Sequence, residues 1–363
     1  MVILHVAAIQ NNPFDGVCVA VPQHVIYEKK YATTGLINIK NSPIKAVESY
    51  PDTQIEYRKP FEINNLPEPF NQPDLVVFHE CYRVEYLTIA INLLHRKIPY
   101  VIGPHGELRI EAQKKKRIKK IIANLLLFNA FTRKAAAIQC LSKEEEEATF
   151  FGKNKILGTN GICIPEKSKT AFNTNKTVFL YIGRYEWRVK GLDILFNAIS
   201  IEAQFLRDNN AVFELYGPDI QGRFSEVKKM VEQSQVEDLV KLNLQISGPA
   251  KEKKLLDSDI FIQTSRHEGM PMGVLEAMSY AIPCLLTDGT TIGPYIEKIG
   301  AGWNGGMDAK MLSTALKTAI YERALWREKG NNAREYVESQ FNWYSVSKET
   351  VEKYKEICLV GKN

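Results

Sequence analysis

The feature that most constrains the fold of this chain is the alternation of short apolar runs with segments of helical periodicity. The runs have strand length and are apolar at successive positions, which is typical of parallel sheets covered by helices on both faces. They lie at Val2–Ile9, Leu75–His79, Tyr100–Gly103, Ala136–Leu141, Lys155–Leu157, Val178–Gly183, Val212–Tyr216, Leu242–Ser247, Ile260–Thr264 and Ile282–Thr287. The sequence therefore predicts an α/β protein with parallel sheets.

Helical periodicity occurs between these runs. We expect helices at Val84–Arg96, Ala112–Arg133, Gly191–Leu206, Phe224–Gln233 and Met272–Tyr280, and a final amphipathic helix over Tyr344–Ile357.

The strand–helix alternation occurs twice, with a polar segment between the two occurrences. Ile164–Lys176 contains a proline and lacks periodicity, as a connection between domains does. A chain of 363 residues has room for about two domains. We predict two Rossmann-like domains that face a central cleft. The N-terminal domain spans residues 1–163, and the C-terminal domain spans 164–343. A C-terminal helix over 344–363 packs back toward the N-terminal domain.

The composition excludes several classes of protein. Hydrophobic residues make up 45% and charged residues 25%, which is ordinary for a globular protein and not for a disordered or collagen-like chain. The six cysteines form no metal-ligand pair and no CxxC motif, as in reduced cytosolic proteins. The N-terminus lacks the basic region of a signal peptide, and the apolar stretch Ile121–Thr132 is too short to span a bilayer. We therefore expect a cytoplasmic protein.

The stretch from Glu268 to Glu276 contains the most informative chemistry. Gly269 and Gly273 let the backbone approach a ligand closely, and Pro271 suits the first turn of a helix. The N–H groups and dipole of that helix start favour an anion such as phosphate. The two flanking carboxylates repel phosphate and would instead accept hydrogen bonds from hydroxyls. A nucleotide sugar presents both a diphosphate and hydroxyls.

Three motifs, in chain order, together resemble the family-4 retaining glycosyltransferases of the GT-B fold. They are Gly103-Pro104-His105-Gly106, then Gly183-Arg184 with Lys190-Gly191, and the run 268–278 (Glu-Gly-Met-Pro-Met-Gly-Val-Leu-Glu-Ala-Met). Asn160-Gly161-Ile162 and Ala281-Ile282-Pro283-Cys284 are also similar to the family. The chain departs from it after the first strand, where relatives often have a glycine pair and this chain has only Gly16.

The resemblance implies that the N-terminal domain, residues 1–163, binds the acceptor and that the C-terminal domain, residues 164–343, binds the nucleotide sugar. It also implies roles for individual residues. Arg184 and Lys190 would stabilise the charge on a departing nucleoside diphosphate, Glu268 would hold the hydroxyls of the donor sugar, and Glu276 those of the ribose. The catalytic candidates are His105, Arg184, Lys190 and Glu268. The donor-binding candidates are Gly16, Arg184, Lys190, Gly217, Gly269, Met270, Pro271, Met272, Gly273, Val274 and Glu276. No cofactor or metal is expected, and Asp257-Ser258-Asp259 is expected to be structural.

The expected activity is retaining transfer of a sugar from a nucleotide-diphosphate sugar to a hydroxyl of a glycan acceptor. A UDP-sugar is the first candidate for the donor and a GDP-sugar the second. The acceptor could be lipid-linked, as in the assembly of bacterial surface polysaccharides such as capsule or O-antigen. Two alternatives stay open: a GT-B nucleotide-sugar epimerase or glycan phosphorylase, and a non-catalytic, membrane-associated module that binds nucleotide sugars.

One segment carries the excess positive charge of the chain. The net charge is +5, and eight basic residues without an acidic one lie between Gln113 and Lys134. Nucleic-acid binding would place basic residues over a larger face. Lys115, Lys116, Lys119 and Lys120 lie beside isoleucines and leucines at helical spacing, which suits an anionic membrane surface or a lipid-linked acceptor. This interpretation predicts a peripheral protein at the inner face of the cell membrane. The alternative is a helix with a buried apolar face and a solvated lysine face.

Overall fold

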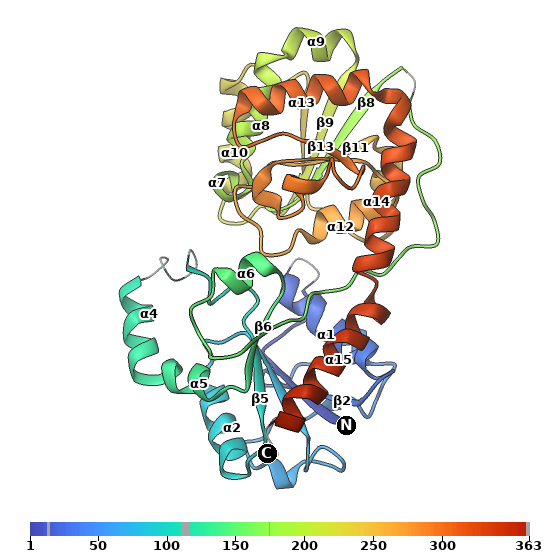
Figure 1. Ribbon diagram of the computed structural model, residues 1–363. Helices are drawn as coiled ribbons and strands as arrows, with labels where there is room; N and C mark the ends of the chain where they lie inside the picture. Colours follow the sequence, from blue (N-terminus) through green and yellow to red (C-terminus); the bar gives the residue numbers. More distant parts are fainter. Residues whose placement is uncertain (13–14, 111–112, 114–116, 174, 361–363) are drawn as a thin grey trace. The chain divides into compact units, whose positions relative to one another are not determined.

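The computed structural model describes residues 1–12, 15–110, 113, 117–173 and 175–360, and the chain divides into two compact units. Unit 1 consists of Met1–Gly161 and Trp343–Asn363, and unit 2 of Ile162–Asn342. Each unit contains one parallel sheet with helices packed on it, so the α/β class is confirmed (Figure 1). The boundaries expected from the sequence lie within two residues of these divisions.

The sheet of unit 1 has seven strands in the order β3-β2-β1-β4-β5-β6-β7, and every neighbouring pair is parallel. The strands are β1 (Val2–Ala7), β2 (Thr33–Asn38), β3 (Gln54–Ile55), β4 (Leu75–His79), β5 (Tyr100–Gly103), β6 (Ala137–Cys140) and β7 (Lys155–Leu157). The helices are α1 (Gly16–Glu28), α2 (Val84–His95), α4 (Arg117–Ala123), α5 (Asn129–Lys134), α6 (Lys143–Glu147) and α15 (Trp343–Val360).

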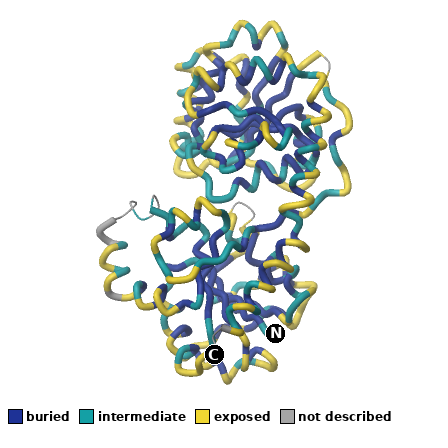
Figure 2. The backbone as a smooth tube through the Cα atoms, viewed as in Figure 1, coloured by how far each residue is buried: buried dark blue, intermediate teal, exposed yellow. Residues whose placement is uncertain are grey.

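Successive residues of the unit 1 strands pack into different cores, because side chains of a strand alternate between the two faces of a sheet. In β4, Val77 packs with Val351 and Tyr354 of α15. Its neighbour Phe78 packs with Tyr86 of α2 and belongs to a separate core. Burial on both faces explains why these strands are continuously apolar in the sequence. Figure 2 shows the resulting buried centre of the unit.

The sheet of unit 2 has six parallel strands in the order β10-β9-β8-β11-β12-β13. The strands are β8 (Thr177–Ile182), β9 (Ala211–Gly217), β10 (Val240–Leu244), β11 (Ile260–Gln263), β12 (Cys284–Leu286) and β13 (Gly302–Asn304). The helices are α7 (Trp187–Lys190), α8 (Leu192–Ile201), α9 (Ala203–Asp208), α10 (Arg223–Gln233), α11 (Gly248–Asp257), α12 (Met272–Ser279), α13 (Ala309–Tyr321) and α14 (Trp326–Gln340). Phe179 of β8 packs in a core with α8 and α13, and Leu180 in a second core with α12 and α14.

The structure corrects three details of the sequence-based prediction. The strands β2, β3 and β13 were not predicted, because they are short or, in β2, contain threonines and a glycine where an apolar run was sought. The helix expected over Ala112–Arg133 is interrupted within its described part by a π-helical segment, Asn124–Phe128. The helix expected over Gly191–Leu206 is divided into α8 and α9.

The segment Ile164–Lys176, expected to connect the domains, is held on unit 2 over its described residues. The backbone N–H of Lys169 donates to Tyr280 O at 2.8 Å, and the Lys169 side chain is buried. Asn173 donates to the buried carboxylate of Asp259 from its backbone N–H at 3.0 Å and from its side-chain amide at 2.8 Å. The segment therefore belongs to the packed structure of unit 2. Among the helices described, none is both long enough and apolar enough to cross a bilayer.

Candidate functional site

Arg184 and Lys190 lie on the segment that follows β8. Two buried tyrosines fix this backbone: Tyr181 Oη donates to Arg184 O at 2.8 Å, and Tyr185 Oη donates to Leu215 O at 2.9 Å. The Arg184 side chain is about half exposed and lies 3.6 Å from the carboxylate of Glu186. Lys190 ends the short helix α7. Both cations thus stand at the carboxyl end of a central strand, where ligands of such sheets bind.

Lys190 forms an ion pair with Glu268. Lys190 Nζ donates to Glu268 Oε1 at 2.5 Å, and only 13% of each side chain is exposed. The same carboxylate oxygen accepts hydrogen bonds from Gln263 Nε2 and Ser265 Oγ, each at 2.6 Å. Hydrogen bonds to ionised groups with little access to water are among the stronger ones in proteins. The lysine and the carboxylate therefore have fixed positions before any ligand binds.

The loops after β8 and β11 are joined directly. Thr264 Oγ1 donates to the carbonyls of Lys190 and Gly191, at 2.9 and 3.0 Å. Arg266 binds Asp193 through two parallel hydrogen bonds of 2.7 and 2.6 Å. These contacts connect the first turn of α8 to the segment that carries Glu268, so the two motifs recognised separately in the sequence form one site.

Glu276 lies on α12 and pairs with a lysine that no sequence motif indicated. Lys251 Nζ, on α11, donates to Glu276 Oε2 at 2.5 Å. Nothing in the run Lys251–Lys254 distinguishes this lysine from its neighbours. Gln263 was also missed, although a polar residue at the end of an otherwise apolar strand is a usable signal.

The residues from Gly269 to Val274 form the turn before α12 and its first residues. Pro271 immediately precedes the helix, and Met272 N–H donates to Met270 O at 3.0 Å. A Cβ on Gly273 would lie 3.3 Å from Ile182 O, so the helix start closely approaches the end of β8. Val274 has a buried side chain, and its N–H donates to Pro271 O at 2.9 Å. Val274 thus contributes its side chain to the core of unit 2, and its N–H is bonded within the turn.

Gly217 ends β9 beside the glycine of the Gly-Arg motif. A Cβ on Gly217 would lie 2.2 Å from Gly183 O, a distance that real Cβ atoms do not show. The glycine is therefore required for the packing of two strand ends, whatever its relation to a donor.

His105 and Gly16 belong to unit 1. His105 follows β5 with a φ of +48°, and its Nε2 lies 3.0 Å from His79 Nδ1. The next residue, Gly106, donates its N–H to Glu145 Oε1 at 2.6 Å. Burial raises the pKa of the Glu145 carboxyl, although its hydrogen bonds to two backbone N–H groups oppose the rise. Gly16 is the first residue of α1, and no described atom lies within 4 Å of the position that a Cβ would take.

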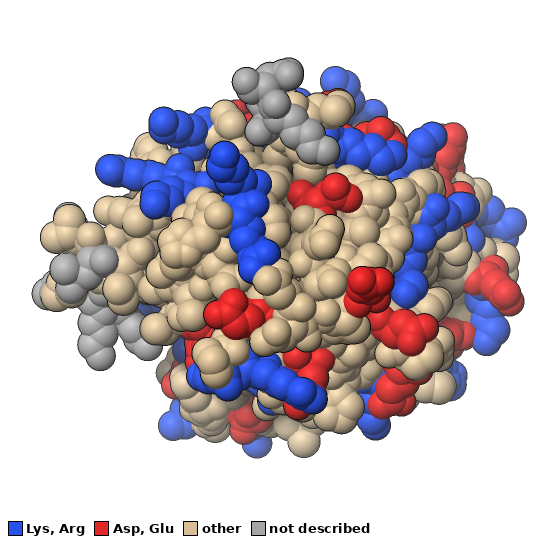
Figure 3. All heavy atoms as spheres, turned by 90° about the horizontal axis from the view of Figure 1, so that it is seen from below, with Lys and Arg blue, Asp and Glu red and all other residues tan. Residues whose placement is uncertain are grey.

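The basic segment of unit 1 exposes apolar side chains. Lys115 and Lys116 lie outside the described residues, whereas Lys119 and Lys120 are part of α4, with Lys120 Nζ 5.0 Å from the ring centre of Tyr82. Ile121 and Ile122 are each 53% exposed and Leu125 is 73% exposed. The alternative interpretation, a helix with a buried apolar face, is therefore wrong for these three residues. In Figure 3, basic side chains and uncharged surface lie together on the left, the side of α4 in Figure 1.

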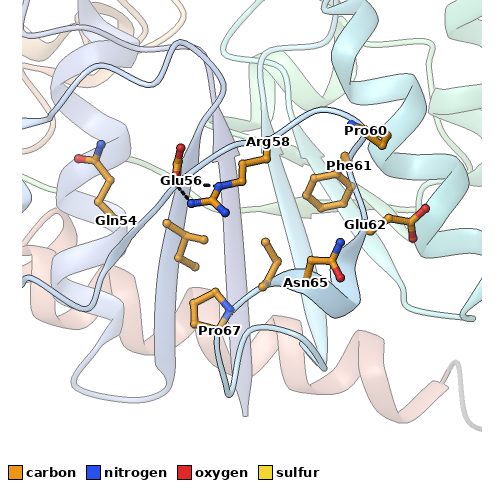
Figure 4. A pocket seen from close by; sticks show the side chains of 10 residues that line it. Gln54, Glu56, Arg58, Pro60, Phe61, Glu62, Asn65 and Pro67 are labelled. Atoms are coloured by element: carbon orange, nitrogen blue, oxygen red, sulfur yellow. Dashed lines mark hydrogen bonds and ion pairs between the residues drawn. The ribbon is translucent and has the colours of Figure 1, made fainter.

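The described residues line a surface hollow in each unit. One, of about 540 Å³, is in unit 1 and is lined by residues between Gln54 and Pro67, including an exposed Glu56–Arg58 ion pair (Figure 4). It contains no residue predicted to be functional. The other, of about 350 Å³, lies in unit 2 against α7 and is lined by Trp187, Arg188 and Arg223 among others. The second hollow thus adjoins the helix that ends in Lys190.

Among the described residues, no group of three or more His, Cys, Asp or Glu side chains is arranged to hold a metal ion. The Asp-x-Asp sequence has structural contacts: Asp259 accepts a hydrogen bond from Val178 N–H at 2.9 Å, and Asp257 pairs with Lys253 at 2.7 Å.

A family comparison covers the unit that holds the paired charges. Residues 164–336 match the model of the family described as glycosyl transferases group 1. The match covers nearly all of unit 2, which spans Ile162–Asn342. The match spans the Arg184, Lys190, Glu268 and Glu276 positions, and it supports glycosyl transfer as the activity of the chain.

Solved structures extend the likeness to the whole chain. Sucrose-phosphate synthase from Thermosynechococcus elongatus is 14% identical, with a TM-score of 0.73 over 99% of this chain and 100% of that one. Anabaena Alr3699/HepE in complex with UDP is 16% identical, with a TM-score of 0.73 over 98% and 100%. WaaG, a glycosyltransferase involved in lipopolysaccharide biosynthesis, is 13% identical, with a TM-score of 0.66 over 97% and 99%. At these identities the likeness establishes the GT-B fold. No curated protein sequence matches the chain.

The position of Lys190 in unit 2 depends on the close packing of the next residue, Gly191. This dependence gives a testable prediction. Gly191 has a φ of +61°, and a Cβ on it would lie 2.0 Å from Thr264 O. Gly191→Ala should therefore lower the free energy of unfolding by about 1–3 kcal/mol beyond the cost of the backbone conformation alone. The measurement is urea denaturation of the variant, its control and the wild type.

The control for this prediction is Gly222→Ala. Gly222 has a similar φ of +71°, but no heavy atom lies within 4 Å of the position that a Cβ would take there. The Gly222→Ala variant therefore measures the cost of placing alanine at a positive φ without a steric clash. Equal losses in the two variants would mean that contact with Thr264 does not constrain Gly191.

Proposed function

We propose that the protein is a retaining glycosyltransferase that needs no metal and transfers a sugar from a UDP-sugar to a hydroxyl of a glycan acceptor. A GDP-sugar is the second candidate donor. The observation that carries the proposal is the pairing of Lys190 with Glu268 and of Lys251 with Glu276 in a group 1 domain. HepE has been solved in complex with UDP, with UDP and glucose, and with UDP-glucose, which favours uridine as the base of the donor.

In the proposed reaction, unit 2 binds the donor. Lys190 and Arg184 stabilise the negative charge that grows on the diphosphate as the glycosidic bond breaks. Glu268 accepts hydrogen bonds from the hydroxyls of the donor sugar, and Glu276 from those of the ribose. Because an ammonium has three N–H donors, Lys190 can keep its bond to Glu268 while it binds a phosphate oxygen. The chain offers no evident nucleophile for a covalent intermediate, so we favour front-face attack, in which the leaving diphosphate helps to accept the acceptor proton.

The proposed acceptor is a lipid-linked glycan used in surface-polysaccharide assembly, reached by peripheral binding to the inner face of the cell membrane. Support comes from α4 and the segment after it. Lys119 and Lys120 are followed in the sequence by Ile121, Ile122 and Leu125, whose side chains are exposed. Basic residues attract anionic lipid head groups, and exposed apolar residues enter the boundary between head groups and acyl chains.

The experiment that tests the proposed function is incubation with a panel of UDP- and GDP-sugars, with and without glycan acceptors, followed by mass spectrometry of the products. Release of UDP together with a lengthened acceptor is expected, with the anomeric configuration of the donor retained by NMR. Formation of an isomerised nucleotide sugar without acceptor, or a requirement for inorganic phosphate, would contradict the proposal.

Glu276→Ala should weaken donor binding. The substitution removes hydroxyl acceptors that are used equally in the ground state and the transition state, so the donor KM should rise while kcat changes little. We expect a rise of about tenfold, equivalent to about 1.4 kcal/mol. Steady-state kinetics with varied donor measures it. Glu252→Ala is the control, because Glu252 pairs with Lys167 on the surface. An unchanged donor KM in Glu276→Ala would remove Glu276 from the ribose site.

Lys190→Ala should lower kcat more than it raises the donor KM, because the charge on the leaving group is largest in the transition state. Loss of one such stabilising group is expected to cost about 10²–10³ in kcat. The matched control is Lys253→Ala, since that lysine is 75% exposed and pairs only one helical turn away with Asp257. A kcat within a few-fold of wild type would assign the role to another residue.

Conversion of Lys115, Lys116, Lys119 and Lys120 to Gln should weaken binding to anionic vesicles. Each basic residue near the surface contributes about 1 kcal/mol, so the quadruple change should cost several kcal/mol and reduce salt sensitivity. Vesicle sedimentation at low and high salt measures the effect. Turnover with a short soluble acceptor should be unchanged.

The charge-matched control for the vesicle experiment changes Lys228, Lys229, Lys298 and Lys310 to Gln, all exposed in unit 2. If the two quadruple variants lose vesicle binding equally, or the wild type does not sediment with anionic vesicles at low salt, the basic segment is an ordinary solvated surface.

A further inference from the structure

Lys251 contacts a candidate donor-binding residue but has no role of its own in the proposed reaction. It lies on α11, which follows β10, and its partner Glu276 lies on α12, which follows β11. Both helices therefore begin beyond the carboxyl ends of strands in one parallel sheet, where ligands of such sheets bind. Lys251 Nζ donates to Glu276 Oε2 at 2.5 Å.

The core of unit 2 fixes the backbone of Glu276 but leaves its side chain to be oriented. The neighbouring residues Leu275 and Ala277 are buried in that core, whereas 33% of the Glu276 side chain is exposed. A glutamate side chain has several rotatable bonds, so a fixed Cα does not by itself fix the carboxylate. Among the described residues, only Lys251 donates a hydrogen bond to this carboxylate, and it does so at Oε2. Lys251 therefore selects the conformation in which Oε1 is presented to a ligand.

The orientation of Lys251 does not come from its own helix. Lys251 is the fourth residue of α11, whose first turn contains no acidic residue and whose preceding Ser247 makes no side-chain cap. The dipole of a helix favours negative groups at this end and gives a lysine no stabilisation there. The ammonium group is instead paired with a carboxylate 25 positions further along the chain.

The neighbouring lysines of α11 have other partners. Lys253 is 75% exposed and pairs with Asp257 within the same helix. Lys254 Nζ donates to Glu214 Oε2 of β9 at 2.7 Å. Each of these lysines thus has its own carboxylate, and Lys251 is the one that pairs with a candidate site residue.

We propose that Lys251 is a positioning residue of the donor site, which holds Oε2 of Glu276 so that Oε1 accepts a hydrogen bond from a ribose hydroxyl of the nucleoside diphosphate. The ribose as the ligand of Glu276 rests on the proposed function, whereas the single conformation of the carboxylate follows from the ion pair. An acceptor that is held in place before the ligand arrives loses little freedom on binding, which improves affinity. The hydroxyl is bound alike in the ground state and the transition state, so Lys251 acts on donor binding more than on kcat.

The test compares two nucleotides that differ only in the ribose hydroxyls. UDP has both of them and dideoxyuridine diphosphate has neither, and isothermal titration calorimetry gives the Kd of each for the wild type and for Lys251→Met. Methionine keeps an unbranched side chain but removes the ammonium group. A direct attraction between the ammonium and the diphosphate is the same for both nucleotides and cancels in the comparison.

The substitution should raise the Kd of UDP about three- to tenfold more than the Kd of the dideoxy nucleotide, the scale of one hydrogen bond. In a Glu276→Ala background, Lys251→Met should affect the two nucleotides equally, because the carboxylate through which Lys251 acts is gone. Equal changes for the two nucleotides in the otherwise wild-type protein would overturn the proposal.

Two further variants serve as controls. Lys253→Met makes the same change on the same helix at an exposed lysine that pairs with Asp257, and it should leave the Kd of both nucleotides unchanged. Lys251→Arg keeps a charged N–H donor for the carboxylate and should restore most of the preference for UDP over the dideoxy nucleotide. A preference lost equally in Lys251→Arg and Lys251→Met would also contradict positioning through this hydrogen bond.

A crystal structure of Lys251→Met without nucleotide separates the inference from the proposed function. Both side chains of the pair are partly exposed, so the variant should fold. Glu276 should adopt more than one side-chain conformation, and a single conformation like that of the wild type would overturn the proposal. Several conformations of Glu276 in the variant, together with a wild type that binds neither UDP nor GDP, would contradict only the proposed function.

Discussion

The contact between Gly191 and Thr264 is the constraint on which the arrangement of the unit 2 site depends. The absence of a side chain lets the backbone at the start of α8 lie against the carbonyl at the end of β11. The Thr264 hydroxyl then bonds the carbonyls of both Lys190 and Gly191. With the two loops joined, the lysine of one and the carboxylate of the other meet at 2.5 Å. The ion pair is thus a consequence of backbone packing, and the two sequence motifs have to occur together.

Buried carboxylates perform a related task in both units, since each holds a segment by accepting backbone or side-chain N–H groups. Asp259 fixes the segment that enters unit 2, and Glu145 joins Gly106 to Leu141 beside His105. Glu28 differs, because both its oxygens face histidines rather than backbone. Leaving a buried carboxylate unpaired costs several kcal/mol, so these contacts specify the loops on which the candidate residues lie.

Sequence patterns predicted the strands and site residues that depend on local periodicity and on contiguous motifs. β4 and β5 were predicted with the bounds they have, because residues buried on both faces give an uninterrupted apolar run. β2 was missed because its threonines and glycine interrupt such a run. Glu268 and Glu276 were identified from a motif, whereas Lys251 reaches Glu276 only through tertiary packing. The hydrogen bonds that connect Glu28, His5, His79 and His105 join four separate segments of the chain, so no local pattern could have indicated them.

The two candidate sites differ in a way that suits different ligand groups. In unit 2, Lys190 and Lys251 are each paired with a carboxylate, so the site has cations for a diphosphate and acceptors for hydroxyls at fixed positions. The ammonium groups can bind the diphosphate of the proposed donor, and the carboxylates can accept hydrogen bonds from its hydroxyls. An intact nucleotide sugar satisfies both. In unit 1, burial lowers the pKa of His105 to about 3, so this imidazole is neutral at neutral pH and can form a hydrogen bond with a hydroxyl without attracting or repelling a phosphate. The charge distribution of each unit thus selects for the part of the proposed reaction assigned to it.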